Sequence, residues 1–283
     1  MTLLPIPHQW QAWITENLQR DCTPESLLQI MVNNKFDRTD SQAAIAFLAN
    51  KLKQSTAQAP ANSDYIYQQA RIADGNMLHV QGRVVRVVTR VKQPVIVQMD
   101  GFLTVEECDE LIRLAKQKLK PSTVVDPVTG DFTVITERSS YGTYFTLCEN
   151  DFITALDQRI SALMNCPLEN GEGIQILNYP VGAEYKEHFD YFDPNQAGSQ
   201  QQIARGGNRI ATLVMYLNDV KAGGETVFPG IGFSAIPKKG SAVYFEYCNS
   251  FGQLDALTLH AGAPVQAGEK WIATKWVRER RYG

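Results

Sequence analysis

The feature that most constrains what this chain can fold into is a set of three residues. His188 and Asp190 lie two positions apart, and His260 follows much later in the sequence. Side chains two residues apart on a β-strand point to the same side. If residues 186–191 form a strand, His188 and Asp190 face one cavity and Phe189 points away. His260, from a distant strand, then completes a set of two histidines and one carboxylate. Such a set on one side of a metal is typical of Fe(II) centres that keep coordination positions open.

A lysine that follows His260 indicates a second part of the same site. Residues 260–280 read as a strand, a Gly/Pro turn and a second strand. The side chains that share one face of this second strand are Lys270, Ile272, Thr274 and Trp276. A lysine that points inward among such neighbours is costly unless it meets an anion, and a bound dicarboxylic acid would supply one. The opposite register, with Lys270 in solvent and Trp271 buried, fits the alternation equally well.

Several further motifs follow one another in the second two-thirds of the chain. They are YPVGAEYKEHFDYF (179–192), RGGNRIATLVMYLNDVKAGGETVFP (205–229), GSAVYFEY (240–247) and DALTLHAGAPVQAGEKWIATKWVRE (255–279). Together with GFLTVEECDELI (101–112) and RSSYGTYF (138–145), they resemble the prolyl 4-hydroxylase family of Fe(II)- and 2-oxoglutarate-dependent dioxygenases. The similarity begins at about Val95 and runs to the C-terminus.

The resemblance implies a mainly β fold with flanking helices, built on a double-stranded β-helix of the jelly-roll type. The sequence agrees with this, because short strand-like runs recur between Gly/Pro/Asn/Asp turns. It also implies that His188, Asp190 and His260 bind Fe(II), and that Lys270 pairs with the distal carboxylate of 2-oxoglutarate.

Six further residues receive roles, four from the same resemblance and two arginines from the chemistry of the guanidinium group. Tyr179 hydrogen-bonds the distal carboxylate of 2-oxoglutarate, and Thr212 lines its pocket. Tyr185 and Trp276 flank a proline ring, since aromatic walls suit a flat apolar ring. The guanidinium groups of the remaining two, Arg138 and Arg209, grip backbone carbonyls of the substrate. For the first four residues, the alternative role is core packing. For the two arginines, it is a surface salt bridge.

The implied reaction is 4-hydroxylation of a prolyl residue in a peptide or protein. It consumes O₂, releases succinate and CO₂, and uses L-ascorbate as a reductant.

Two segments are predicted to be loops near the site. In the family, the region that corresponds to residues 122–137 is a loop that folds over a peptide. Residues 193–208 read here as a second open loop. For both segments the alternative is a plain surface connection. Two rival functions stay open: the same chemistry on a free amino acid, another side chain or a small metabolite, and a non-catalytic oxygen or 2-oxoglutarate sensor or scaffold.

The composition excludes several other classes of protein. A hydrophobic content of 44%, a charged content of 20% and a net charge of −3 are ordinary for a globular protein. No dense Lys/Arg run suggests a nucleic-acid partner, and no apolar run approaches the roughly 18–20 residues of a membrane span. The N-terminus lacks the basic and apolar segments of a signal peptide. The five cysteines form no C-x-x-C pair, which predicts free thiols in a reducing cytoplasm.

The chain divides into three predicted parts. Residues 1–60 are a helical N-terminal domain with a linker, 61–94 are connecting strands, and 95–283 are the dioxygenase domain. We expect the helical part to brace the oxygenase or to form a homodimer, with binding of another partner as the alternative.

Local signals place some helices within these parts. Thr23 and Pro24 predict the start of a helix that runs to Val32 and buries Leu27, Leu28, Ile30 and Met31. A further helix is expected near Ser41 to Leu52. Thr104 to Glu107 reads as a capping box that opens a helix from Val105 to Lys118.

Overall fold

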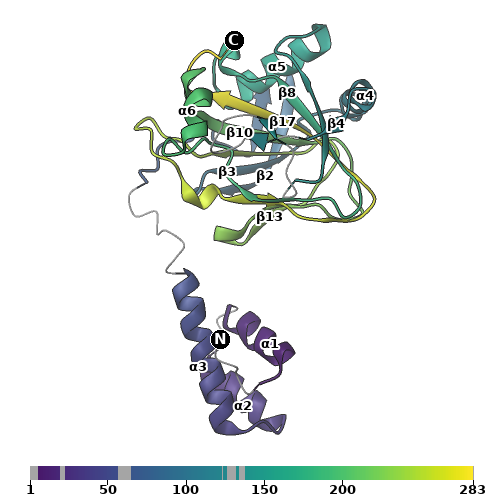
Figure 1. Ribbon diagram of the computed structural model, residues 1–283. Helices are drawn as coiled ribbons and strands as arrows, with labels where there is room; N and C mark the ends of the chain where they lie inside the picture. The colour runs from purple at the N-terminus through teal and green to yellow at the C-terminus, as the bar shows by residue number, and fades with distance from the viewer. Residues whose placement is uncertain are drawn as a thin grey trace. The chain divides into compact units, whose positions relative to one another are not determined.

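The computed structural model describes residues 6–19, 23–56, 65–122, 124–125, 132–133 and 138–282. The chain separates into two compact units, Met1–Ser63 and Asp64–Gly283 (Figure 1). The predicted connecting strands of 61–94 supply β1 (Met77–Val80) and β2 (Arg83–Val91), which belong to the main sheet of the second unit. Most of the predicted linker, residues 57–64, lies outside the described residues.

The first unit is a three-helix cluster made of α1 (His8–Gln19), α2 (Pro24–Asn33) and α3 (Arg38–Thr56). Its own apolar core consists of Ile6, Ile14, Leu27, Met31, Ala44, Ile45 and Leu48. Thr23 caps α2 as predicted, since its hydroxyl accepts a hydrogen bond from Ser26 N at 3.3 Å.

Two details of this unit differ from the prediction. The helix α3 begins at Arg38 rather than near Ser41, because the carboxylate of Asp37 accepts hydrogen bonds from the free N–H groups of Thr39 and Asp40. The predicted burial of Ile30 is wrong: its side chain is 41% exposed, because the buried stripe of α2 follows Leu27 and Met31.

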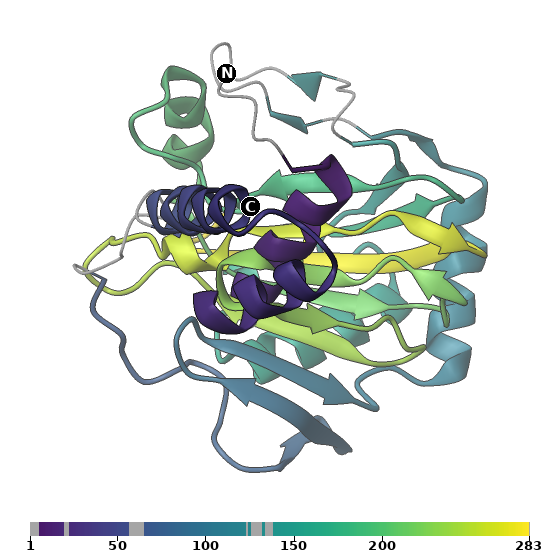
Figure 2. The same cartoon turned by 90° about the horizontal axis from the view of Figure 1, so that it is seen from below.

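The second unit is built on a nine-stranded sheet in the order β1-β2-β3-β14-β10-β17-β8-β7-β4 (Figure 2). The remaining strands of this sheet are β3 (Ile96–Asp100), β4 (Lys120–Pro121), β7 (Tyr141–Phe145), β8 (Ile174–Tyr179), β10 (Arg209–Tyr216), β14 (Ala242–Glu246) and β17 (Lys270–Arg278). A four-stranded sheet has the order β13-β12-β15-β9. Its strands are β9 (Tyr185–His188), β12 (Thr226–Phe228), β13 (Phe233–Ala235) and β15 (His260–Gly262).

From β8 onward the chain passes back and forth between these two sheets: β8, β10, β14 and β17 belong to the nine-stranded sheet, and β9, β12, β13 and β15 belong to the four-stranded sheet. The pairings of these strands are antiparallel. This arrangement is the double-stranded β-helix that the sequence predicted. Two short pairs complete the unit: β11 (Ala222–Gly223) with β16 (Val265–Ala267), and β5 (Val124–Val125) with β6 (Phe132–Thr133).

Helices α4 (Val105–Lys116) and α5 (Asp151–Met164) belong to the second unit (Figure 1). They contribute buried side chains to the same apolar core as the strands. The capping box at Thr104 and Glu107 is present as predicted, although α4 ends at Lys116. No helix among the described residues is long and apolar enough to cross a membrane.

The two predicted open loops have different outcomes. Within 193–208 the chain forms α6 (Ala197–Ala204), so the loop prediction is wrong there. The helix is anchored because Arg278 donates hydrogen bonds to the carbonyls of Gln202 and Gly207. Of the segment 122–137, residues 123, 126–131 and 134–137 lie outside the described part of the chain.

A buried ion pair ties α5 to the outer face of the nine-stranded sheet. Lys275 Nζ lies 2.6 Å from Asp157 Oδ1, and the two side chains are 3% and 0% exposed. The second carboxylate oxygen of Asp157 accepts a hydrogen bond from Cys148 N at 2.8 Å. Alternation along β17 explains the position of Lys275, since Thr274 and Trp276 point to the opposite face, into the interior between the sheets.

Removing one partner of this pair should destabilise the protein strongly. We expect Asp157→Ala to lower the free energy of unfolding by about 3–5 kcal/mol, because it leaves the buried ammonium of Lys275 without its carboxylate. The double variant Asp157→Leu/Lys275→Met should lose much less. Urea denaturation measures both.

The exposed pair of Lys118 and Glu149, with side chains 53% and 30% exposed, is the matched control. Lys118→Met should cost only about 0–1 kcal/mol. If Asp157→Ala cost no more than Lys118→Met, the pair would not anchor α5.

Candidate metal centre

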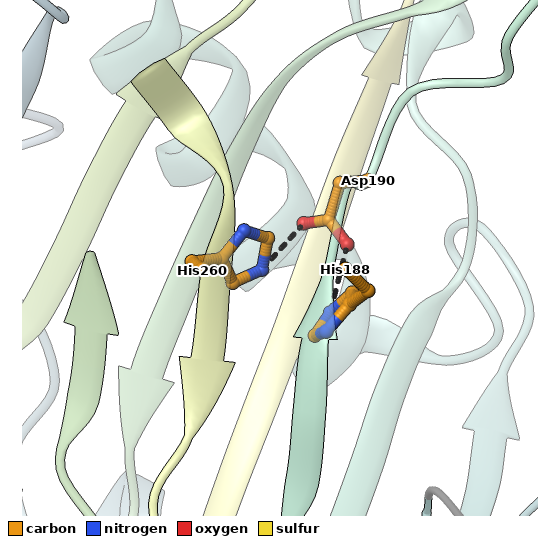
Figure 3. A group of neighbouring side chains, drawn as sticks. All are labelled: His188, Asp190 and His260. Atoms are coloured by element: carbon orange, nitrogen blue, oxygen red, sulfur yellow. Dashed lines mark ion pairs between the residues drawn. The ribbon is translucent and has the colours of Figure 1, made fainter. Parts of the chain in front are cut away.

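Two short strands of the four-stranded sheet bring the histidines together. In the pairing of β9 with β15, His188 lies directly opposite His260. The two imidazole rings are 4.3 Å apart between centroids. Asp190 follows two residues after His188, and its carboxylate faces one nitrogen of each ring (Figure 3).

The strand that carries His188 is shorter than predicted. β9 ends at His188 instead of continuing to residue 191, although Phe189 does point outward and is 38% exposed. Beyond His188 the backbone is held by contacts near the start of β10. Arg209 Nη1 donates to the carbonyl of Asp190 at 3.3 Å, and Phe192 N donates to Asn208 Oδ1 at 2.8 Å.

The three ligand atoms face one another. Asp190 Oδ1 lies 3.7 Å from His188 Nε2, and Asp190 Oδ2 lies 3.7 Å from His260 Nε2. One ligand atom from each residue lies within 4.8 Å of the others. Among the described residues, this is the one group of three or more His, Cys, Asp or Glu side chains that could hold a metal ion. The separation leaves room for one ion between them, because metal–nitrogen and metal–oxygen bonds are roughly 2.0–2.2 Å long.

Hydrogen bonds to the backbone set the tautomer of both histidines. His188 Nδ1 lies 2.7 Å from the carbonyl of Lys186, and His260 Nδ1 lies 3.0 Å from the carbonyl of Thr258. A carbonyl oxygen can only accept, so each Nδ1 carries the proton and each Nε2 presents its lone pair. Partners of this kind orient metal-binding histidines.

The charges of the cluster also suit a cation. Burial, reinforced by the neighbouring His260, lowers the pKa of His188 to about 3, so this imidazole is neutral at pH 7. Burial alone would raise the pKa of Asp190, but His260, His188 and Arg209 outweigh it and lower that pKa. Two imidazoles and one carboxylate fit Fe(II) and leave it with net positive charge for an anionic chelate.

The cluster lies in a cavity between the two sheets. Residues from β8, β9, β12, β15 and β17 line it. The predicted inward face of β17 lines the cavity with Lys270, Ile272, Thr274 and Trp276. β17 therefore has the register that turns Lys270 inward, and Trp271 is buried on the opposite face, towards the outer side of the sheet.

Lys270 is a buried cation beside the metal-ligand cluster. It is 2% exposed, and it lies opposite Tyr179 in the pairing of β17 with β8. Its Nζ is 5.4 Å from the centre of the Tyr179 ring, and no described carboxylate forms an ion pair with it. Burial lowers the pKa of Lys270 to about 8, against the opposing charge of Glu225. The site therefore favours a ligand that brings a negative charge to this end of the cavity.

A glycine makes room for the lysine stem. Gly224 has φ of +72°, and a Cβ at this position would lie 3.3 Å from Lys270 Cδ. A larger residue would need both a strained backbone and a displaced lysine.

The predicted substrate-side residues form a wall near His188. The ring of Tyr185 stacks on the His188 imidazole with centroids 3.6 Å apart, and the Arg138 guanidinium lies 4.7 Å from the centre of the Tyr185 ring. Arg138 Nη2 donates to Gln175 Oε1 at 3.2 Å. All of these residues line the cavity together with Trp276.

Thr212 and Arg209 lie elsewhere than predicted. Neither is among the residues that line the cavity. Thr212 Oγ1 donates to Asp190 Oδ2 at 2.6 Å instead of facing the lysine pocket. Arg209 forms two hydrogen bonds with Glu172, at 2.7 and 2.9 Å, and its guanidinium lies 3.8 Å from the centre of the Trp276 ring.

The sequence did not reveal the partners of these two residues. Glu172 is held between Arg209 and Arg278, whose Nε donates to Glu172 Oε1 at 2.6 Å. Burial would raise the pKa of Glu172, but the two guanidinium groups lower it. The hydroxyl of Tyr247 lies 3.0 Å from Thr212 Oγ1. The sequence assigned no role to Glu172 or Tyr247, although Tyr247 ends the motif GSAVYFEY, because both contacts join segments that are distant in sequence.

Loss of any one ligand should empty the metal site without unfolding the sheets. We expect Asp190→Ala to weaken Mn(II) binding by more than about a hundredfold, because changes in residues behind a ligand already cost about 10–100-fold. His188→Ala and His260→Ala should behave alike. Calorimetric titration of the purified protein measures the affinity, and circular dichroism measures the fold.

Glu187→Ala is the matched control, since this carboxylate is exposed on the same strand. It should bind Mn(II) as the unchanged protein does. Wild-type affinity in Asp190→Ala would place the metal outside this cluster.

Comparison with known proteins agrees with the site. The model of the 2OG-Fe(II) oxygenase superfamily matches residues 174–278, a range that contains the three ligand residues and Lys270. The chain is 40% identical over 203 residues to prolyl 4-hydroxylase 5 of Arabidopsis thaliana, and the match covers 65% of this chain and 68% of that protein. It is 36% identical over 188 residues to prolyl 4-hydroxylase subunit alpha-1 of Homo sapiens, covering 66% of this chain and 35% of that protein.

Among solved structures, the chain is similar to a viral collagen prolyl hydroxylase from Paramecium Bursaria Chlorella virus-1 in its 2OG complex. The TM-score is 0.52 and the identity is 31%, over 65% of this chain and 95% of that chain. The sequence relatives, the matched model and the fold agree with the ligand cluster. The chain therefore belongs to the prolyl 4-hydroxylase family of oxygenases, which use Fe(II), 2-oxoglutarate and O₂.

Proposed function

We propose that this protein hydroxylates prolyl residues of a peptide or protein at C4, with 2-oxoglutarate and O₂ as cosubstrates. The observation that carries the proposal is one cavity that combines three parts. It has the ligand cluster of His188, Asp190 and His260, the buried Lys270, and a wall formed by Tyr185, Trp276 and Arg138. Fe(II) bound to the cluster would supply the oxidation of the substrate C–H bond by O₂.

Lys270 and Tyr179 are proposed to bind the distal carboxylate of 2-oxoglutarate. The two residues lie side by side on neighbouring strands, and both are buried in the cavity wall. A carboxylate at this position would neutralise a cation that has no ion-pair partner among the described side chains. The same contact would orient the other end of the dicarboxylate towards the ligand cluster.

Substitution of Lys270 should weaken cosubstrate binding. We expect Lys270→Ala to raise the apparent Michaelis constant for 2-oxoglutarate roughly ten- to a hundredfold, since a charge-assisted contact contributes about 1.5–3 kcal/mol. Tyr179→Phe should cost less, because one neutral donor is lost. Lys221→Ala, which removes an exposed lysine, is the control.

The affinity should also depend on pH through the same group. Because the pKa of Lys270 is about 8 in the free protein, the ammonium is present below pH 8 and is lost above it. Binding of 2-oxoglutarate should therefore weaken as pH rises beyond 8, by up to about tenfold per unit. Lys270→Arg should lack this decline, since a guanidinium stays charged. A wild-type affinity that is constant from pH 7 to 10, together with an unchanged affinity in Lys270→Ala, would show that Lys270 does not bind the carboxylate.

The wall formed by Tyr185, Trp276 and Arg138 supports a peptidyl substrate. Aromatic faces suit the apolar ring of proline, and a guanidinium can donate to backbone carbonyls on either side of it. Arg138 is held by Gln175 and lies over the Tyr185 ring, so its position is fixed before a substrate arrives. Free proline lacks the flanking carbonyls, which makes a peptide the better ligand.

Turnover of peptides separates this function from its rivals. We expect a proline-rich peptide to gain one oxygen atom at C4 of proline, with release of one succinate, whereas free proline is not turned over. Mass spectrometry and amino-acid analysis detect the product. Arg138→Ala should raise the Michaelis constant for the peptide roughly tenfold or more while leaving that for 2-oxoglutarate unchanged.

Arg86→Ala, on the distant strand β2, is the control for loss of an arginine. Equal turnover of free proline would favour a small-molecule enzyme. Absence of any hydroxylated peptide from protein that binds metal and 2-oxoglutarate would favour a sensor.

Three further properties are proposed with this function. Ascorbate would act as the reductant that keeps the metal as Fe(II), as the family resemblance implies. A cytoplasmic location is supported by the free thiols of Cys108, Cys148, Cys166 and Cys248. A homodimer through the helical unit is supported by Ile30 and Phe47, which are 41% and 43% exposed on a unit with its own core. Unchanged sedimentation of a chain with both residues replaced by Glu would contradict the dimer.

A further inference from the structure

Two buried hydroxyl groups form a chain that ends on the carboxylate of Asp190. Thr212 Oγ1 lies 2.6 Å from Asp190 Oδ2, and the hydroxyl of Tyr247 lies 3.0 Å from Thr212 Oγ1. Both residues are 0% exposed. Neither lines the cavity, so neither is placed to touch a cosubstrate or a peptide.

The direction of donation along this chain follows from the groups themselves. A carboxylate that binds a metal can only accept hydrogen bonds. Thr212 therefore gives its single proton to Asp190, and its oxygen is left as an acceptor. Tyr247 must then be the donor to Thr212. Hydrogen bonds are therefore donated from Tyr247 to Thr212 and from Thr212 to Asp190. Removal of the Tyr247 hydroxyl breaks the first bond, and removal of the Thr212 hydroxyl breaks both.

The backbones of Thr212 and Tyr247 have more hydrogen-bonded support than the backbone of Asp190. Thr212 lies within β10, paired with Phe245 on one side and with Trp276 on the other. The backbone of Tyr247 is bonded at both of its polar groups, because its N–H donates to Ile210 O at 3.1 Å and its carbonyl accepts from Asp255 N at 2.8 Å.

Asp190 has less support from the backbone. It follows the end of β9 and takes no part in a strand pairing. Its hydrogen bonds with the described residues are the one from Thr212 to its side chain and the one from Arg209 to its carbonyl. Without the first of these, the carboxylate could rotate about its side-chain bonds away from the two histidines.

We propose that Thr212 and Tyr247 are positioning residues of the metal centre. The pair holds the Asp190 carboxylate in one orientation between His188 and His260, and thereby sets the affinity for the metal. Thr212 acts directly on Asp190, and Tyr247 acts through Thr212. The inference rests on the metal site of the proposed function, and it holds whichever substrate that site oxidises.

Mn(II) titration of the full-length protein, followed by electron paramagnetic resonance without O₂ or 2-oxoglutarate, tests this role. Thr212→Val removes the donor at nearly constant volume, and it should weaken Mn(II) binding about 10–100-fold. Thr212→Ser keeps the hydroxyl and should remain within about twofold of the unchanged protein. Tyr247→Phe removes only the second link and should weaken binding about two- to tenfold, as expected for one neutral hydrogen bond.

A double variant shows whether Tyr247 acts through Thr212. In the Thr212→Val background, Tyr247→Phe should weaken Mn(II) binding no further, because the link is already broken. The melting temperature of each metal-free variant separates positioning from simple loss of stability. Weakened Mn(II) binding at an unchanged metal-free melting temperature, with rescue by Thr212→Ser, supports the proposal.

Two results would overturn it. Wild-type Mn(II) affinity in Thr212→Val would show that the carboxylate needs no such support. If Tyr247→Phe weakened Mn(II) binding as much in the Thr212→Val background as in the unchanged protein, Tyr247 would act independently of Thr212. Failure of the proposed function looks different: the unchanged protein would bind Mn(II), and the variants would weaken it as described, but no peptide would be hydroxylated.

Discussion

The pairing of two short strands, β9 with β15, is the constraint on which the site depends. It places His188 opposite His260, although the two residues are far apart in the sequence. Side chains directly opposite each other on antiparallel strands have Cβ atoms only about 4.5–5.5 Å apart, close enough to share one ion. A slip of one residue would turn one histidine to the other face and destroy the cluster. The β12–β15 and β12–β13 pairings extend the same sheet and hold β15 in place.

Around this pairing, the interior holds more charge than a sheet core usually tolerates. Glu172 is enclosed by two arginines, Asp157 is paired with Lys275, and both groups lie outside the cavity. Lys270 differs from them, because the protein provides no ion-pair partner for it among the described residues. Burial of such a cation costs free energy in the empty protein, and an anionic cosubstrate would remove that cost on binding. These structural charges thus have ion-pair partners within the fold, while Lys270 in the cavity is left for a ligand.

Much of the site could be predicted because it depends on local patterns. The His-x-Asp spacing places His188 and Asp190 near each other without knowledge of distant contacts. Alternation along β17 left both registers open for Lys270, and the family resemblance predicted the inward one. The end of β9 could not be predicted, because it is set by Arg209 and Asn208 from another part of the chain. Thr212 was expected at the 2-oxoglutarate pocket, and only the packed structure shows that its hydroxyl reaches Asp190.

The fold itself was predicted from the family resemblance and from the rhythm of short strands. The helix α6 was missed for a physical reason. The surrounding segment 193–208 is rich in Gln and Gly, and the helix is held in place by a hydrogen bond from Arg278, a residue of the distant strand β17. The exposure of Ile30 was missed because helical spacing identifies an apolar face but does not fix how wide the buried stripe is.

The most direct test of this account is a crystal structure of the protein with Mn(II) and 2-oxoglutarate, with the metal located by anomalous scattering. The account predicts one ion that contacts Nε2 of His188, Nε2 of His260 and the carboxylate of Asp190, with one carboxylate of 2-oxoglutarate on Lys270 Nζ. A metal bound away from these three residues, or a 2-oxoglutarate molecule whose distal carboxylate does not contact Lys270, would contradict it.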